Sequence, residues 1–122
     1  MLLPHMSSNV VKRDDFVGAL DSVAQTVNSI TRRKGWWDEE GNNGEKIALI
    51  HSELSEMLEA YRHGNKPSEH ISEFSGAEEE AADVVIRVMD FCYQRKLRLG
   101  EAIIAKIQYN ATRPVKHGGK LF

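Results

Sequence analysis

Apolar residues recur at the spacing of an α-helix in four segments, and this pattern constrains the fold more than any other feature of the chain. In the first segment, Phe16, Leu20, Val23, Val27 and Ile30 follow one another at steps of three or four residues, which places them on one helix face. Similar spacing predicts four helices, at about residues 14–33, 44–63, 76–96 and 99–112. No segment alternates like a strand. We therefore expect an all-α, four-helix bundle-like fold.

Residues that start and stop helices support these limits. Gly35 and Gly64 follow the first and second segments, where a left-handed residue commonly ends a helix. Ser75 and Glu78 have the spacing of a capping box at the start of the third. Pro114 cannot continue the fourth.

The third segment has an unusually wide apolar surface. Two neighbouring faces of this helix are apolar, formed by Val84, Val88 and Phe91 and by Val85, Met89 and Cys92. A chain of 122 residues has little other apolar surface to cover both faces. We therefore expect a second copy to cover one, giving a homo-oligomer, either a dimer or a tetramer.

Composition limits the partners and the compartment. The length fits one domain, which we assign to residues 14–122 behind an N-terminal tail at 1–13. The net charge of −2 gives no positive field for a nucleic-acid backbone, so we expect no nucleic-acid partner. The sequence contains no apolar run of about 18 residues, the length that a membrane-spanning helix needs, so we expect no membrane span. The single cysteine, Cys92, is interpreted as a buried, reduced thiol, which fits a cytoplasmic protein.

Two pairs of carboxylates have the spacing of a metal site. Glu53 and Glu56 leave one face of the second helix, and Glu80 and Asp83 repeat that spacing on the third. Four carboxylates in one pocket would repel one another unless cations neutralised them. Oxygen ligands favour Mg²⁺, with Mn²⁺ as a substitute.

Three alternatives to a magnesium site concern the same acidic residues. A zinc site would use Cys or His ligands, and a di-iron bundle would need Glu-x-x-His pairs, which neither pair provides. Charged residues on solvated helix faces are common, and spacing alone leaves this interpretation open.

The acidic pairs, together with two other segments, resemble the MazG-like, all-α nucleoside triphosphate pyrophosphatases. The resemblance lies in the first pair, in the second pair within EEAAD, in RKGWWDE before the second helix, and in the ending with Lys106, Tyr109, Asn110, Arg113, Pro114 and KHGGK. It covers about residues 14–122.

The resemblance implies a Mg²⁺-dependent enzyme that hydrolyses a nucleoside triphosphate to the monophosphate and pyrophosphate. Such enzymes are helical dimers or tetramers, and nucleotide-pool housecleaning is the expected role. Glu53, Glu56, Glu80 and Asp83 carry over as metal ligands. Either Glu53 or Glu56 is expected to orient or deprotonate the attacking water.

Four residues are predicted to contact the substrate. Lys106, Asn110 and Arg113 share one face of the last helix, where they suit phosphate oxygens and a sugar or base edge. Trp37 lies in a loop and could stack on a nucleobase. A solvated polar face and a tryptophan packed at the core edge are the open alternatives.

Basic residues elsewhere have alternative roles. Arg87 lies four residues after Asp83, and an ion pair with Asp83 or Asp90 is preferred over substrate contact. Lys116, His117 and Lys120 could reach phosphate or belong to a mobile end. For the whole chain, the alternatives to an enzyme are a non-catalytic nucleotide- and metal-binding or regulatory module of the same fold, and a plain interaction bundle.

Overall fold

The computed structural model describes residues 12–114, which form four helices. The helices are α1 (Arg13–Arg33), α2 (Asn43–Arg62), α3 (Gly76–Gln94) and α4 (Leu99–Ala111). Within the described residues no strand forms, and the only β feature is an isolated bridge between Pro67 and Ser75. The predicted all-α class is confirmed, and all helix limits agree with prediction to within two residues.

Local sequence explains where the helices begin and end. The Ser75 hydroxyl accepts the backbone N–H of Glu78, and the Glu78 carboxylate accepts that of Ser75, so the predicted capping box is confirmed. Gly35 and Gly64 have φ values of +85° and +88°, as expected of residues that follow a helix. The side chain of Asn42 caps α2 by accepting the backbone N–H of Glu45.

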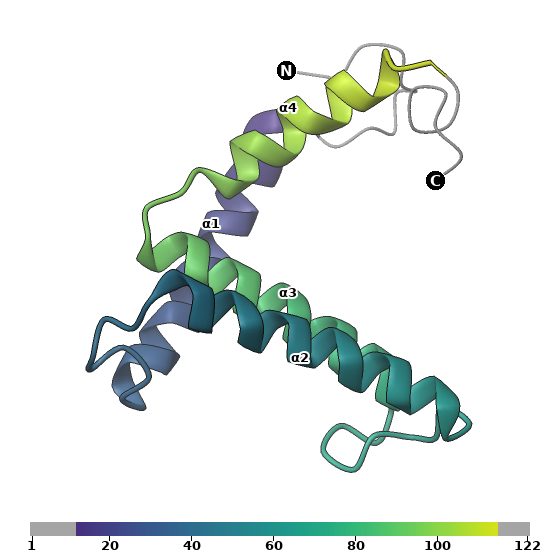
Figure 1. Ribbon diagram of the computed structural model, residues 1–122. Coiled ribbons are helices and arrows are strands. Elements are labelled where there is room, and N and C mark those ends of the chain that lie inside the picture. Colours follow the sequence, from purple (N-terminus) through teal and green to yellow (C-terminus); the bar gives the residue numbers. More distant parts are fainter. Residues whose placement is uncertain (1–11, 115–122) are drawn as a thin grey trace.

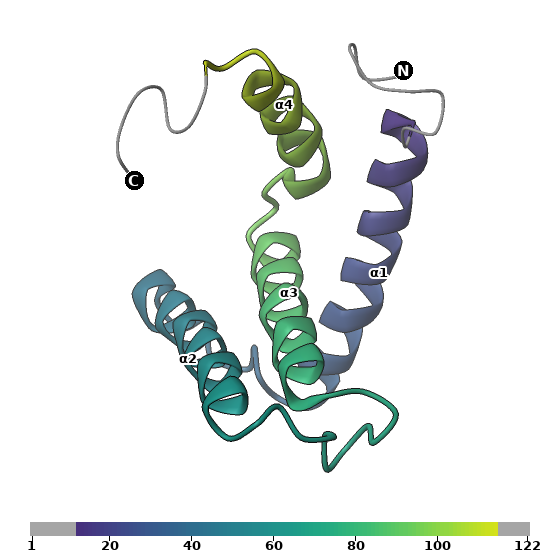
Figure 2. The same cartoon turned by 90° about the vertical axis from the view of Figure 1, so that its right-hand side faces the viewer.

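The central helix of the fold is α3. Helix α2 packs along one side of α3 and α1 along another, while α4 packs on α1 and contacts the end of α3 (Figure 1). Both views show α2 and α3 side by side, with α4 directed away from this pair (Figure 2). Helix α2 packs on neither α1 nor α4, so the arrangement is more open than a closed four-helix bundle.

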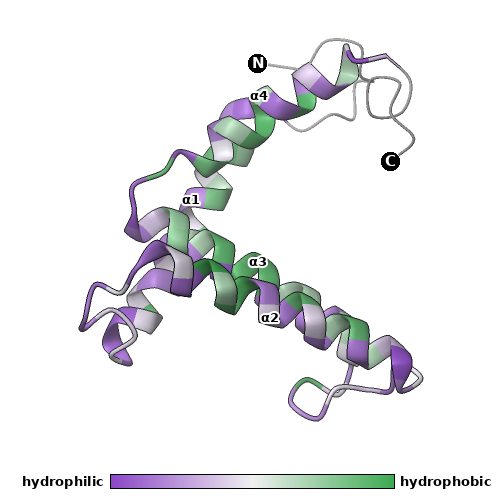
Figure 3. Ribbon diagram, in the orientation of Figure 1, coloured by the Kyte–Doolittle hydropathy of each residue, from purple (hydrophilic) through white to green (hydrophobic). Residues whose placement is uncertain are grey.

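Much of the apolar surface remains exposed. Among the described residues the buried apolar side chains are Ala24, Ala77, Met89 and Ile104. Green apolar residues run along α2, α3 and α4 in Figure 3, and several large ones are exposed, including Ile47, Leu54, Leu58, Tyr61 and Val85. The helical spacing of Ile47, Ile50, Leu54, Met57 and Tyr61 predicts a core face on α2, but in the single chain Ile47, Leu54 and Tyr61 are exposed.

The buried face of α1 is also rotated from the predicted stripe. Val23 and Ile30 are exposed, whereas Ala24, Asn28 and Thr31 are buried. The reason is that α1 packs on α3 through polar side chains as well as apolar ones, which hydrophobic spacing cannot reveal.

Cys92 is only half-buried, so the expectation of a buried thiol was too strong, although burial does raise the pKa of this thiol.

None of the helices between residues 12 and 114 combines the length and apolar character that a bilayer crossing requires.

Candidate metal centre

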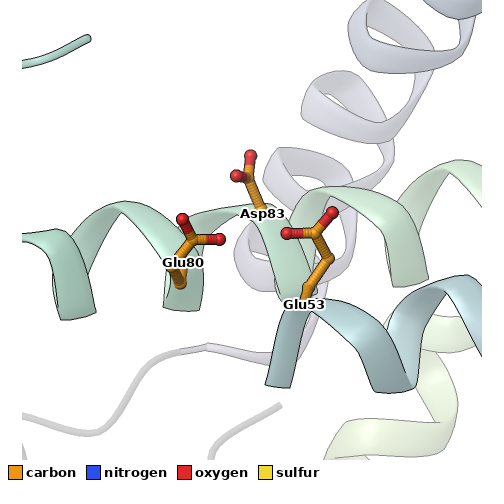
Figure 4. A group of neighbouring side chains, drawn as sticks. All are labelled: Glu53, Glu80 and Asp83. Carbon is orange, nitrogen blue, oxygen red and sulfur yellow. The ribbon is translucent and has the colours of Figure 1, made fainter. Parts of the chain in front are cut away.

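Three of the four predicted carboxylates meet between α2 and α3. Glu53 reaches across from α2 toward Glu80 and Asp83, which leave α3 one turn apart (Figure 4). One carboxylate oxygen from each residue lies within 4.8 Å of the other two. The spacing read from the sequence therefore places three acidic groups close enough to share one cation.

Burial makes this cluster costly without a cation. Glu53 is only 9% exposed, and Glu80 and Asp83 are partly buried. Oε2 of Glu80 is buried and has no hydrogen-bond partner among the described residues. An unpartnered buried carboxylate oxygen is unfavourable, and a bound cation would satisfy it.

The same environment changes the acidity of the two α3 carboxyls. Burial is the largest cause that raises the pKa of Glu80 to about 7, and the neighbouring carboxyl groups of Glu53 and Glu56 raise it further. Burial, with the negative charge of Glu53 next, also raises the pKa of Asp83, while the positive charge of Arg87 opposes this rise. Both shifts have the sign that burial and neighbouring negative charges give to a carboxyl group.

The donor set fits a hard divalent cation. The three converging groups offer only carboxylate oxygens, and such ligands favour Mg²⁺ or Mn²⁺ over softer metals. The residues present could therefore hold a hard divalent cation.

Glu56 occupies a different position from the other three. It is exposed and is not one of the three converging groups, yet it is close enough to Glu80 to raise the pKa of that carboxyl. Glu56 therefore lies at the solvent side of the cluster.

Arg87 pairs with a different residue from the one expected. Its Nε donates to Oε1 of Glu53 at 2.9 Å, so the expected ion pair with Asp83 or Asp90 is wrong. The side chain is long enough to cross from α3 to α2, and the acceptors of Asp90 are already used by other donors. The guanidinium also lies 5.2 Å from the ring centre of Trp36.

Asp90 is the centre of a buried polar network that sequence reasoning missed. Its Oδ1 accepts hydrogen bonds from Asn28 Nδ2 at 2.8 Å and Thr31 Oγ1 at 2.9 Å, and its Oδ2 accepts from Trp37 Nε1 at 3.0 Å. Asn28 also donates to Gln94. The available signal was weak: Asn28 and Thr31 are polar residues one position after members of the apolar stripe.

Trp37 is packed between cations at the edge of this network. Lys46 Nζ lies 4.2 Å from the centre of its ring, and the Arg95 guanidinium lies 5.4 Å away. A cavity of about 40 Å³ adjoins Trp36, Trp37, Lys46 and Arg87, which is room for about one water molecule. Base stacking by Trp37 therefore requires side chains to move, and it stays a prediction.

Two of the other predicted substrate contacts, Lys106 and Asn110, lie on α4, and Arg113 lies two residues beyond its end. Lys106, Asn110 and Arg113 are exposed, and the Lys106 and Arg113 cations lie 4.5 and 5.8 Å from the ring centre of Tyr109. Because α4 does not pack on α2 and points away from the α2–α3 pair, one chain does not bring these residues to the carboxylates. Lys116, His117 and Lys120 lie outside the described residues.

The fold and site together define an all-helical protein with an acidic, oxygen-only cluster between two helices. Comparisons with protein-family models, with curated proteins and with solved structures find no match for this chain.

Proposed function

We propose that this protein is a Mg²⁺-dependent nucleoside triphosphate pyrophosphohydrolase that acts in nucleotide-pool housecleaning. The observation that carries the proposal is the convergence of Glu53, Glu80 and Asp83, with the buried Glu80 oxygen lacking a partner. The resemblance of the acidic pairs, the tryptophan segment and the ending to MazG-like enzymes supplies the reaction class.

The reaction adds water across the phosphoanhydride bond between the α- and β-phosphates, giving a monophosphate and pyrophosphate. When bound, Mg²⁺ supplies charge neutralisation for the phosphates and acidifies water. The carboxylates of Glu53, Glu80 and Asp83 would hold the cation and so position the triphosphate. Catalysis of this kind depends on positioning and electrostatics, and needs no protein nucleophile.

Glu56 is the better candidate for the residue that accepts a proton from the attacking water. Glu53 is buried and already paired with Arg87, whereas Glu56 is exposed beside the cluster and makes no ion pair with a described residue. An accessible carboxylate next to the cation site has the position that a general base requires.

The proposed enzyme is a homo-oligomer. Support comes from the exposed apolar residues of α2 and α3, which a monomer would leave in water. Within one chain, Lys106, Asn110 and Arg113 do not approach the carboxylates. A neighbouring copy could bring its own three residues to them. We keep these three residues and Trp37 as proposed substrate contacts on that basis.

The decisive experiment is pyrophosphate release from a panel of nucleoside triphosphates with Mg²⁺. We expect release by the wild-type protein, and at least about a hundredfold less by Glu53→Gln, because a metal ligand is lost. Glu73→Gln, which changes an exposed loop carboxylate, is the control and should keep wild-type activity. Equal activity of all three proteins would show that the cluster does not catalyse the reaction.

The alternative is a non-catalytic nucleotide- and metal-binding or regulatory module of the same fold. The packed state of Trp37 and the distant position of α4 favour this alternative for an isolated chain. It predicts calorimetric binding of a nucleoside triphosphate with Mg²⁺ but no pyrophosphate, at any protein concentration.

A further inference from the structure

Arg87 is the only cation that forms an ion pair with the acidic cluster among residues 12–114. Its Nε–Oε1 contact with Glu53 measures 2.9 Å, and both side chains are largely removed from solvent. The positive charge of Arg87 also reaches Asp83, where it opposes the rise in pKa. Without a bound cation, Arg87 is therefore the principal neutralising charge at this site.

A bound divalent cation and this guanidinium would compete for the same carboxylate. Two positive groups beside Glu53 repel each other, and the repulsion is strong in a partly buried site. Glu53 can coordinate the cation fully only if its ion pair with Arg87 weakens. We propose that Arg87 is an internal counter-ion that occupies Glu53 in the metal-free protein and is displaced when a divalent cation binds.

The position of Trp36 makes this exchange observable. The Arg87 guanidinium lies over the Trp36 ring, so displacement of Arg87 changes the charge beside this indole. Trp37 does not face the same change, because its N–H is held by Asp90 and its ring lies near Lys46 and Arg95. The inference rests on the metal site of the proposed function but not on hydrolysis.

The test is the affinity of Mn²⁺, measured by calorimetry without nucleotide, in the wild type and three variants. Arg87→Gln should bind Mn²⁺ at least about tenfold more tightly than wild type, because a competing charge is gone. In EDTA the same variant should unfold at a lower temperature, because Glu53 loses its partner. Arg62→Gln, which removes an exposed Arg–Glu pair at the end of α2, should leave Mn²⁺ affinity unchanged.

Opposite changes in metal affinity and metal-free stability distinguish this role from a purely structural one. If Arg87 only supported the fold, Arg87→Gln would lower both, and that result would overturn the inference, as would unchanged affinity. Arg87→Lys keeps the charge but loses the planar fork. It should bind Mn²⁺ about as the wild type does, and tightening equal to that of Arg87→Gln would also contradict the inference.

A second readout uses fluorescence. The chain has two tryptophans, so Trp37→Phe leaves Trp36 alone. Titration with Mn²⁺ should change the Trp36 emission, and the midpoint of this change should equal the midpoint measured by calorimetry. Mg²⁺ should also change the emission, and it does so without paramagnetic quenching. Adding Arg87→Gln should abolish the Mg²⁺ response. A response that persists would overturn the inference alone, whereas absence of any cation uptake by wild type would overturn both it and the proposed function.

Discussion

The indole N–H of Trp37 donates to Oδ2 of Asp90 at 3.0 Å, which ties the segment before α2 to the middle of the fold. Asp90 is 6% exposed and accepts from Asn28 and Thr31 of α1 through its other oxygen. One carboxylate therefore joins α1, α3 and the tryptophan segment. The C-terminal side of α3 adds to this link, since Arg95 donates to the backbone oxygens of Glu40 and Gly41.

Loss of this carboxylate should destabilise the protein severely. Asp90→Ala removes an acceptor from three buried or partly buried donors. Asn28 and Thr31 each keep a second acceptor, whereas Trp37 has no other among the described residues, and we expect the free energy of unfolding to fall by about 2–4 kcal/mol. Urea denaturation followed by circular dichroism measures this change. Asp21→Ala, at an exposed site on α1, is the control, and a similar small loss in both variants would show that the network contributes little.

The stability of the metal-free protein should depend on pH through Glu80. Its folded pKa of about 7 lies above the unfolded value of 4.5. The folded protein therefore binds the extra proton more tightly, and this stabilising contribution is complete below about pH 4.5 and is lost as the pH rises through about 7.

Glu80→Gln removes this dependence because glutamine resembles the protonated acid. At pH 8 in EDTA we expect the variant to be more stable than wild type by about 1–3 kcal/mol, and at pH 4.5 the difference should disappear. Urea titrations at both pH values measure the change. A stability gain that is the same at both would mean that ionised Glu80 carries no penalty.

Cation uptake should release protons from the same group. Because the pKa of Glu80 is about 7, cation binding at pH 7 should release a fraction of a proton per site, and affinity should rise from pH 6 to pH 8. Calorimetry in two buffers of different ionisation enthalpy gives the proton count. Glu80→Gln should lose this contribution, and an unchanged proton count in that variant would assign the release to another group.

The connection between α2 and α3 should depend on Ser68. This buried hydroxyl donates to Glu79 and accepts the backbone N–H groups of His70 and Ile71, each at 3.1 Å. Ser68→Ala should increase hydrogen exchange at these two amides and lower the free energy of unfolding by about 1–3 kcal/mol. Exchange rates equal to those of wild type would show that the hydroxyl does not hold the connection.

The exposed apolar face of α2 should control assembly. Leu54, Leu58 and Tyr61 follow one another at steps of four and three, and Leu58 and Tyr61 are 53% and 63% exposed. We expect light scattering after size-exclusion chromatography to give a dimer or tetramer for wild type and a smaller species for Leu58→Glu, because a buried charge opposes association. Ser55→Glu, at an exposed position outside this face, should assemble normally. A monomeric wild type would contradict the proposed oligomer.

Predictions from helical spacing succeeded where the cause was local. Helix limits depend on neighbouring residues, such as the reciprocal bonds of Ser75 and Glu78, so the sequence was sufficient to place them. Spacing also placed Glu80 and Asp83 on one side of α3. Predictions that depended on which faces meet were less successful: Val23 and Ile30 were expected to be buried and are exposed.

Packing between helices decided the remaining features of the site. The way α2 packs on α3 brings Glu53 into the cluster and leaves Glu56 at its solvent side. Spacing alone does not distinguish the two residues, because they lie three positions apart on one face of the helix. The long side chain of Arg87 reaches from α3 to α2 and pairs with Glu53. Asn28 and Thr31 are buried against α3, where they donate to Asp90. The sequence by itself determined the helices and the faces that carry acidic groups, because hydrogen bonding and periodicity act over a few residues. Only the tertiary structure decided which of these groups share a site, because that depends on contacts between residues far apart in the chain.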